Sequence, residues 1–195
     1  MTGDWTRYIG TIADGLRHLA VTDRAEATIA PADGFARWVA LTDAVRARDG
    51  QLFLIGNGGS AGMASHMAAD ACKNGHLRAL ALNDVAMITA TANDVAYEQV
   101  FSLALQRLAR RGDLLITISS SGNSPNVVHA LETAHGIGMG TVTLSAKGGD
   151  NKSRTRGDLN FYVPLPRYGW AESAHQVVLH YWFDLYLDKH KDGAL

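Results

Sequence analysis

Short runs of apolar residues recur along the chain and predict buried strands. The clearest are QLFLIG at 51–56, DLLITIS at 113–119 and GTVTLS at 140–145, and each ends in glycine or serine. Nearly continuous apolar runs of this length are typical of strands that are covered on both faces. Two weaker runs, at 79–82 and 159–163, predict further short strands.

Helical periodicity fills the intervals between these runs. We expect helices over 5–30, 33–48, 60–74, 96–111, 125–138 and 169–189, with Pro31 interrupting the first pattern. Strands that alternate with helices indicate an α/β fold, a three-layer sandwich around a mainly parallel sheet. The first and last helices stand outside this alternation, so we expect them to serve in packing or oligomerisation.

The length and composition favour one globular domain. A chain of 195 residues with 47% hydrophobic residues can build a sizeable core. We expect a single domain over 1–195, with an N-terminal helical oligomerisation segment at 1–32 and a core at 33–195. The formal charge of -1 does not suggest a basic face for nucleic acid.

The same composition bears on the compartment. No apolar run approaches the ~20 residues that a membrane span needs, and MTGDWTRYIG lacks the blocks of a secretory signal. Cys72 is the one cysteine, so no internal disulfide is possible. We therefore expect a cytoplasmic protein without a membrane partner, in which Cys72 is a small buried residue.

A glycine-rich turn follows the strand predicted at 51–56. Its sequence, Gly56-Asn57-Gly58-Gly59-Ser60-Ala61, lies between a strand and a helix, where free N–H groups and the helix dipole favour an anion. The spacing also fits a dinucleotide fingerprint, with Asp84 near the distance expected of a ribose-binding acid. A tight turn that binds nothing is the third interpretation.

A serine-rich turn follows the strand predicted at 113–119. Ser124 and Pro125 suit the N-cap and first position of a helix, but capping does not explain Ser119, Ser120 and Ser121. Several hydroxyl and N–H groups at a helix start suit a phosphate monoester. Because both turns end strands of one parallel sheet, we expect one phosphorylated sugar to contact both.

Four stretches carry a family resemblance. They are LFLIGNGGSAGMASHMAAD (52–70), TATANDVAYEQVF (89–101), ISSSGNSPNVVHALETAHGIGMGTVTLSAKGG (118–149) and, more loosely, AESAHQVVLH (171–180). In them the chain resembles the sugar isomerase (SIS) domain family and, within it, the phosphoheptose isomerases. The resemblance implies a flavodoxin-like sandwich, a homotetramer with active sites near subunit interfaces, and conversion of sedoheptulose 7-phosphate to D-glycero-D-manno-heptose 7-phosphate.

The resemblance also implies roles for particular residues. Phosphate would be held by Ser119, Ser120, Ser121 and Ser124. The metal and acid–base positions fall on His66, Asp70, Glu172 and His180. Further substrate contacts fall on Asn57, Gly58, Gly59, Ser60, Asn93 and Asp94, with Glu172.

The side chains of the metal positions support that reading on their own. His66 and Asp70 are four residues apart, and Glu172 and His180 are eight apart, so each pair shares one face of its helix. Two nitrogen and two oxygen ligands fit a divalent metal, with Zn²⁺ expected and Mn²⁺, Fe²⁺ or Ni²⁺ open. The alternatives are a surface His66–Asp70 pair and a structural contact between Glu172 and His175.

Two positions depart from the family pattern. Where the family usually has Glu, this chain has Asp70, whose side chain is shorter. Where the family usually has Gln, this chain has Glu172, which adds a negative charge. The segment 167–170 also departs, and it places Tyr168 and Trp170 near the expected pocket. These differences put the identity of the sugar in question.

The resemblance suggests a mechanism. An aldose–ketose interconversion moves a proton between adjacent carbons through an enediol. We expect His180 and Asp70 to carry the protons, while a metal held by His66, Glu172 and the same two residues polarises the oxygens. Other interpretations are a non-catalytic SIS protein that binds a sugar phosphate or a protein partner, including a replication initiator, an isomerase of another phosphosugar, and a nucleotide-cofactor protein.

Overall fold

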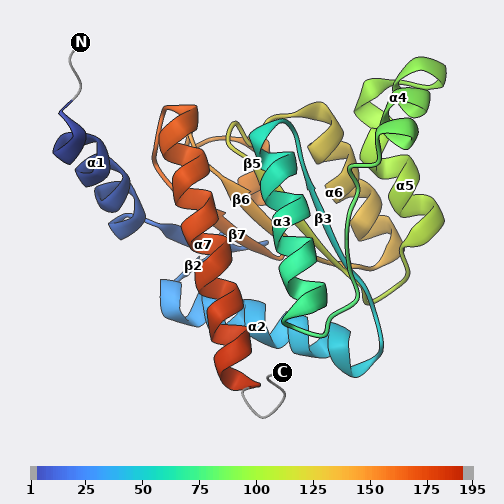
Figure 1. Ribbon diagram of the computed structural model, residues 1–195, viewed down its shortest axis with the longest axis horizontal. Coiled ribbons are helices and arrows are strands. Elements are labelled where there is room, and N and C mark those ends of the chain that lie inside the picture. The colour runs from blue at the N-terminus through green and yellow to red at the C-terminus, as the bar shows by residue number, and fades with distance from the viewer. Residues whose placement is uncertain (1–3, 191–195) are drawn as a thin grey trace.

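The computed structural model describes residues 4–190 and forms a seven-stranded sheet between two layers of helices (Figure 1). The strand order is β2-β1-β7-β6-β5-β3-β4. The strands are β1 (Ala20–Asp23), β2 (Thr28–Ile29), β3 (Leu52–Gly56), β4 (Ala79–Ala81), β5 (Leu114–Ser119), β6 (Gly140–Ser145) and β7 (Leu159–Tyr162). Pairing is parallel from β7 to β4, whereas β1 pairs antiparallel with both β7 and β2. The expected three-layer α/β fold is confirmed.

Within residues 4–190, seven α-helices surround this sheet. They are α1 (Trp5–Arg17), α2 (Pro31–Ala47), α3 (Gly59–Lys73), α4 (Val85–Asp94), α5 (Val100–Leu108), α6 (Pro125–Ile137) and α7 (Tyr168–Lys189), with 3₁₀ turns η1 (Tyr97–Gln99) and η2 (Lys152–Thr155). One core lies between the sheet and α2, α3 and α7, and the other lies between the sheet and α5 and α6. In the larger core, the fully buried rings of Trp38 and Trp182 stack with centroids 4.5 Å apart and join α2 to α7.

The predicted helix at 5–30 is wrong beyond Arg17. Residues 20–29 form the hairpin of β1 and β2 instead, and β1 pairs with β7 from Ala20↔Tyr162 to Asp23↔Leu159. The Asp23 carboxylate accepts hydrogen bonds from the N–H groups of Ala25 and Ala27 and so closes the turn. Pro31 does not interrupt a helix but begins α2 at its first turn, where its missing N–H costs nothing.

Two other expectations need correction. Helix α4 is absent from the prediction, and the helix expected at 96–111 is η1 followed by the shorter α5. Asp84 begins α4, because its carboxylate accepts a hydrogen bond from the Met87 N–H at 2.8 Å. Cys72 is exposed on the outer face of α3, not buried, and its Sγ lies 3.2 Å from the Ala79 carbonyl oxygen.

Candidate functional site

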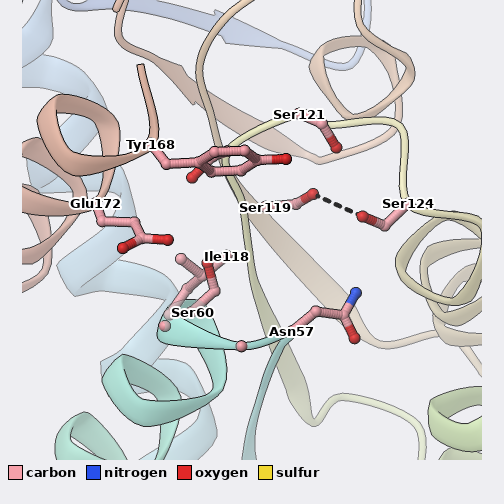
Figure 2. Close-up of a pocket in the computed structure, with 11 residues that line it drawn as sticks. Asn57, Ser60, Ile118, Ser119, Ser121, Ser124, Tyr168 and Glu172 are labelled. Atoms are coloured by element: carbon pink, nitrogen blue, oxygen red, sulfur yellow. Dashed lines mark hydrogen bonds between the residues drawn. The ribbon is translucent and has the colours of Figure 1, made fainter. Parts of the chain in front are cut away.

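A cavity of about 250 Å³ opens at the carboxyl ends of β3 and β5, where the first turns of α3, α6 and α7 meet (Figure 2). This is the edge at which open α/β sheets bind ligands. Eleven residues line it: Asn57, Gly58, Gly59, Ser60, Ile118, Ser119, Ser120, Ser121, Ser124, Tyr168 and Glu172. The structure therefore brings the glycine-rich and serine-rich turns together, as the sequence predicts.

The glycine turn is shaped by its backbone. Gly58 has a φ of 56°, in the left-handed region that favours glycine. The Asn57 side chain is held by reciprocal amide hydrogen bonds with Asn126 at 3.0 and 2.9 Å, and the Tyr97 hydroxyl donates to its Oδ1 at 3.0 Å. Asn126 and Tyr97 were not singled out in the sequence. The position of Asn126 in the first turn of the helix after the serines was the available signal.

The serine turn keeps its hydroxyl groups for the cavity. Ser124 occupies the N-cap of α6, yet its side chain makes no capping hydrogen bond and lies 3.5 Å from the Ser119 hydroxyl. Ser121 accepts a hydrogen bond from the Asn123 N–H at 3.2 Å. The buried Ser120 Oγ has no hydrogen-bond partner among residues 4–190. Such underused hydroxyl groups at a helix N-terminus suit an anionic ligand.

Glu172 and Tyr168 close the cavity from the first turn of α7 (Figure 2). Glu172 approaches the N-terminus of α3, where the lack of a side chain at Gly59 leaves room for its carboxylate. Tyr168 is 60% exposed and lies above the serine turn. Trp170, which the sequence also places near the pocket, is not among its lining residues and packs instead on Tyr8 of α1, with ring centroids 5.9 Å apart.

A second polar cluster lies further from the N-terminal ends of α3 and α7. One side-chain donor atom from each of His66, Asp70 and His180 lies within 4.8 Å of the other two. His66 Nε2 is 3.5 Å from Asp70 Oδ2, and the rings of His66 and His180 are 5.4 Å apart. Donors around one Zn²⁺ ion are about 3.4 Å apart, given bonds of about 2.1 Å, so small rotamer changes would complete such a site. The donor set fits a divalent cation with at least one open coordination position.

Glu172 is not in this cluster. It precedes His180 by eight residues on the continuous helix α7, which is about 12 Å along the axis. The cluster that the described residues form therefore holds three of the four expected ligands, while Glu172 lines the cavity with the serines.

His175 does not hold Glu172 either. Its ring is fully buried, and neither nitrogen makes a hydrogen bond within residues 4–190. Burial lowers the pKa of His175 to about 4, so the ring is neutral near pH 7. The structural alternative proposed for Glu172 is thus not what the geometry shows.

Asn93 and Asp94 lie outside the cavity. Both are exposed at the end of α4, where the Asn93 amide donates to the Asp94 carboxylate at 2.7 Å. Neither is among the residues that line the cavity. Asp84, the candidate ribose ligand of the dinucleotide interpretation, is the cap of α4.

Comparison with known proteins identifies the family. The model of the SIS domain matches residues 19–146. The chain belongs to the SIS domain family. A phosphoheptose isomerase of Desulfovibrio desulfuricans is 49% identical over 109 residues, or 53% of this chain and 52% of that protein. One of Dechloromonas aromatica is 35% identical over 139 residues, or 67% of this chain and 71% of that protein.

Solved structures agree with this assignment to the SIS domain family. A phosphoheptose isomerase from Neisseria gonorrhoeae superposes with a TM-score of 0.80 at 30% identity, covering 93% of this chain and 94% of that chain. One from Francisella tularensis has a TM-score of 0.80 at 25% identity, covering 93% and 95%. The described residues contain no helix long and apolar enough to cross a membrane.

Proposed function

We propose that this SIS protein is an aldose–ketose isomerase that converts sedoheptulose 7-phosphate to D-glycero-D-manno-heptose 7-phosphate. The observation that carries the proposal is the convergence of His66, Asp70 and His180 on the two helices whose first turns line the serine-rich cavity. The phosphoheptose isomerase relatives support the choice of substrate.

The serine turn would bind the phosphate end of the sugar. Ser119, Ser121 and Ser124 present hydroxyl groups beside the N-terminus of α6, and Gly58 and Gly59 line the same cavity at the N-terminus of α3. Because this interaction energy comes from the non-reacting end, it is available to fix the position of the carbonyl end.

His66, Asp70 and His180 would hold a divalent cation, with Zn²⁺ the expected ion. When bound, such an ion supplies Lewis-acid polarisation of the sugar oxygens. Two imidazoles with one carboxylate are a common donor set for catalytic zinc.

Proton transfer would fall to His180 and Asp70. In the ketose-to-aldose direction a base removes a proton from C1, an enediol forms, and an acid delivers a proton to C2 while the hydroxyl proton moves between the two oxygens. A side chain that is bound to the cation is not a free base, so His180 and Asp70 would each transfer a proton only while not coordinated. We assign the C–H proton to His180 and the oxygen-bound proton to Asp70.

A homotetramer with sites near subunit interfaces belongs to the same proposal, as does a cytoplasmic location. The His66 side chain is 51% exposed, and Val177 and Tyr181 are exposed on the same helix as His180. An apolar face beside a polar cluster suits burial against a second copy, which would exclude water from the reacting sugar.

Deuterium incorporation tests the proposal. The Zn²⁺-supplied protein is incubated with sedoheptulose 7-phosphate in heavy water, and the aldose product is examined by NMR. Deuterium at C2 is expected, and H180A is expected to abolish it with an unchanged melting temperature. No aldose from the wild-type protein would exclude this substrate, and activity in H180A would remove His180 from the mechanism.

A second candidate function is non-catalytic binding of a sugar phosphate or a protein partner. The observation in its favour is that Glu172 adds a carboxylate to the cavity and lies apart from the His66–Asp70–His180 cluster. Metal content after purification separates the two candidates, because a binding protein of this kind needs no bound cation.

A further inference from the structure

Lys147 follows β6 in an unusual backbone conformation. Its φ is 56°, in the left-handed region, although Gly148 and Gly149 follow it in the same loop. Two hydrogen bonds hold this residue in place: its N–H donates to the Leu165 carbonyl at 3.2 Å, and the Tyr162 hydroxyl donates to its carbonyl at 2.8 Å. A strained residue that its surroundings hold firmly is a feature of functional sites.

The side chain of Lys147 is directed to the roof of the cavity. Its Nζ lies 3.1 Å from the centroid of the Tyr168 ring, which is a close cation–π contact. Tyr168 itself lines the cavity above the serine turn (Figure 2). The ammonium group is therefore kept at the cavity rim by an aromatic ring that lines the cavity.

The charge of the cavity lining shows why a nearby cation would matter for an anionic ligand. Among its lining residues, Glu172 is the one with a formally charged side chain, and it is acidic. A phosphate ester bound by the serines would be repelled by that carboxylate, and the partial charges of two helix N-termini oppose this only in part. Arg167, the other nearby cation, lies over Trp170, which is not a lining residue. Lys147, by contrast, contacts Tyr168, which is a lining residue of the cavity.

We propose that Lys147 is a phosphate-binding residue, stored on the ring of Tyr168 in the free protein and moved onto the phosphate when a phosphorylated ligand enters the serine turn. Tyr168 is then a positioning residue for that ammonium group. The inference rests on the proposed function only in taking the ligand to be a phosphate ester. It does not depend on isomerisation or on the metal.

Titration with inorganic phosphate tests the inference without turnover. Calorimetry is run on the wild-type protein, K147M, which keeps the length of the side chain, and K147R, which keeps its charge. K73M is the control, because Lys73 is exposed at the far end of α3. We expect K147M to bind phosphate about tenfold more weakly or worse, K147R within about threefold of wild type, and K73M unchanged.

Two further measurements separate a charge effect from a change of shape. The phosphate affinity of the wild-type protein should fall with rising NaCl concentration, and the slope should be smaller in K147M. Y168F keeps the ring and should bind as the wild type does, whereas Y168L should lose about threefold. Melting temperatures show whether each variant is folded.

The outcomes distinguish this inference from the proposed function. Wild-type phosphate affinity in a folded K147M, or no measurable binding by the wild type, overturns the inference. Lys147-dependent phosphate binding by a protein that isomerises no heptose supports it while the proposed function fails. If the protein is an isomerase, K147M should raise the KM for the sugar phosphate far more than it lowers kcat.

Discussion

A Cβ atom built on Gly59 would lie 2.8 Å from the Glu172 Oε2. The first turn of α7 thus presses a carboxylate onto the first residue of α3, where the positive end of the helix dipole stabilises it. The absence of a side chain at Gly59 allows this contact, and the contact in turn fixes where Glu172 enters the cavity. The glycine-rich turn therefore positions an acid as well as offering N–H groups to a ligand.

Replacing Gly59 with alanine should displace Glu172. We expect G59A to weaken phosphate binding severalfold, because the displaced carboxylate loses the stabilising end of the α3 dipole and repels the anion more strongly. The double variant G59A/E172A should bind as E172A alone does, because the clash disappears with the carboxylate. A double-mutant cycle measured by calorimetry checks this coupling. G62A, at an open position on the same helix, is the matched control. Strict additivity of the two substitutions would show that the predicted clash is relieved elsewhere.

Removing either imidazole should empty the metal cluster. H66A and H180A each delete one of three donors that lie within 4.8 Å, so we expect zinc content after dialysis to fall from about one ion per chain to near zero. Elemental analysis provides the measurement. H129A, which changes an exposed histidine on α6, should retain the ion. Equal zinc in all four proteins would mean that the ion binds elsewhere.

Ser124 should matter for binding more than for stability. Its hydroxyl makes no capping bond, so S124A should lower the free energy of unfolding by less than the roughly 1 kcal/mol that loss of a helix cap usually costs. D84A is the contrast, because Asp84 does cap α4, and it should lose about that amount. Urea denaturation measures both. We expect S124A, and not D84A, to weaken phosphate binding. A large stability loss in S124A would assign the hydroxyl to the fold.

The buried ring of His175 should make stability depend on pH. Its pKa in the folded chain is about 4, below the ordinary value of 6.5, so the unfolded chain takes up a proton that the folded chain resists. The free energy of unfolding should therefore be unaffected by His175 above pH 6.5. As the pH falls from 6.5 towards 4, it should decrease by about 3 kcal/mol in total.

Urea unfolding at pH 7, 6 and 5 measures this effect. The wild-type protein should lose more stability over this range than H175F, in which the titrating ring is absent, and the difference between the two isolates His175 from the carboxylates. Parallel losses in both proteins would contradict the assignment. Burial lowers the pKa of His135 as well, so H135F serves as a second comparison that measures the contribution of His135 to the same loss of stability.

The parallel part of the sheet could be predicted because its signals are local. Strands β3, β5 and β6 are uninterrupted apolar runs, and their following turns carry glycine and serine in the sequence itself. The hairpin of β1 and β2 could not be predicted. Its four-residue strand β1 depends on pairing with β7, which lies more than 130 residues away in the chain, and the two-residue strand β2 pairs with β1 alone. Helix α4 was missed because VAMITATAND is rich in β-branched residues that favour helices weakly.

In the candidate site, too, local features could be predicted from the sequence and long-range contacts could not. The serine hydroxyls lie within seven residues of one another, so their grouping was visible in the sequence. His66 and His180 are 114 positions apart, and only the packing of α3 beside α7 brings their rings together. The separation of Glu172 from them follows from the uninterrupted course of α7. The spacing of Glu172 and His180 predicts that they share one face of α7, but it does not show which of them lies beside His66.

The sheet has consequences for how copies of the chain would meet. Its outermost strands, β2 and β4, contain two and three residues. Such short margins offer few unpaired backbone groups, so neither border is a good template for continuing the sheet into another molecule. Association is left to the outer surfaces of the helices, and the half-exposed His66 side chain lies on one of them.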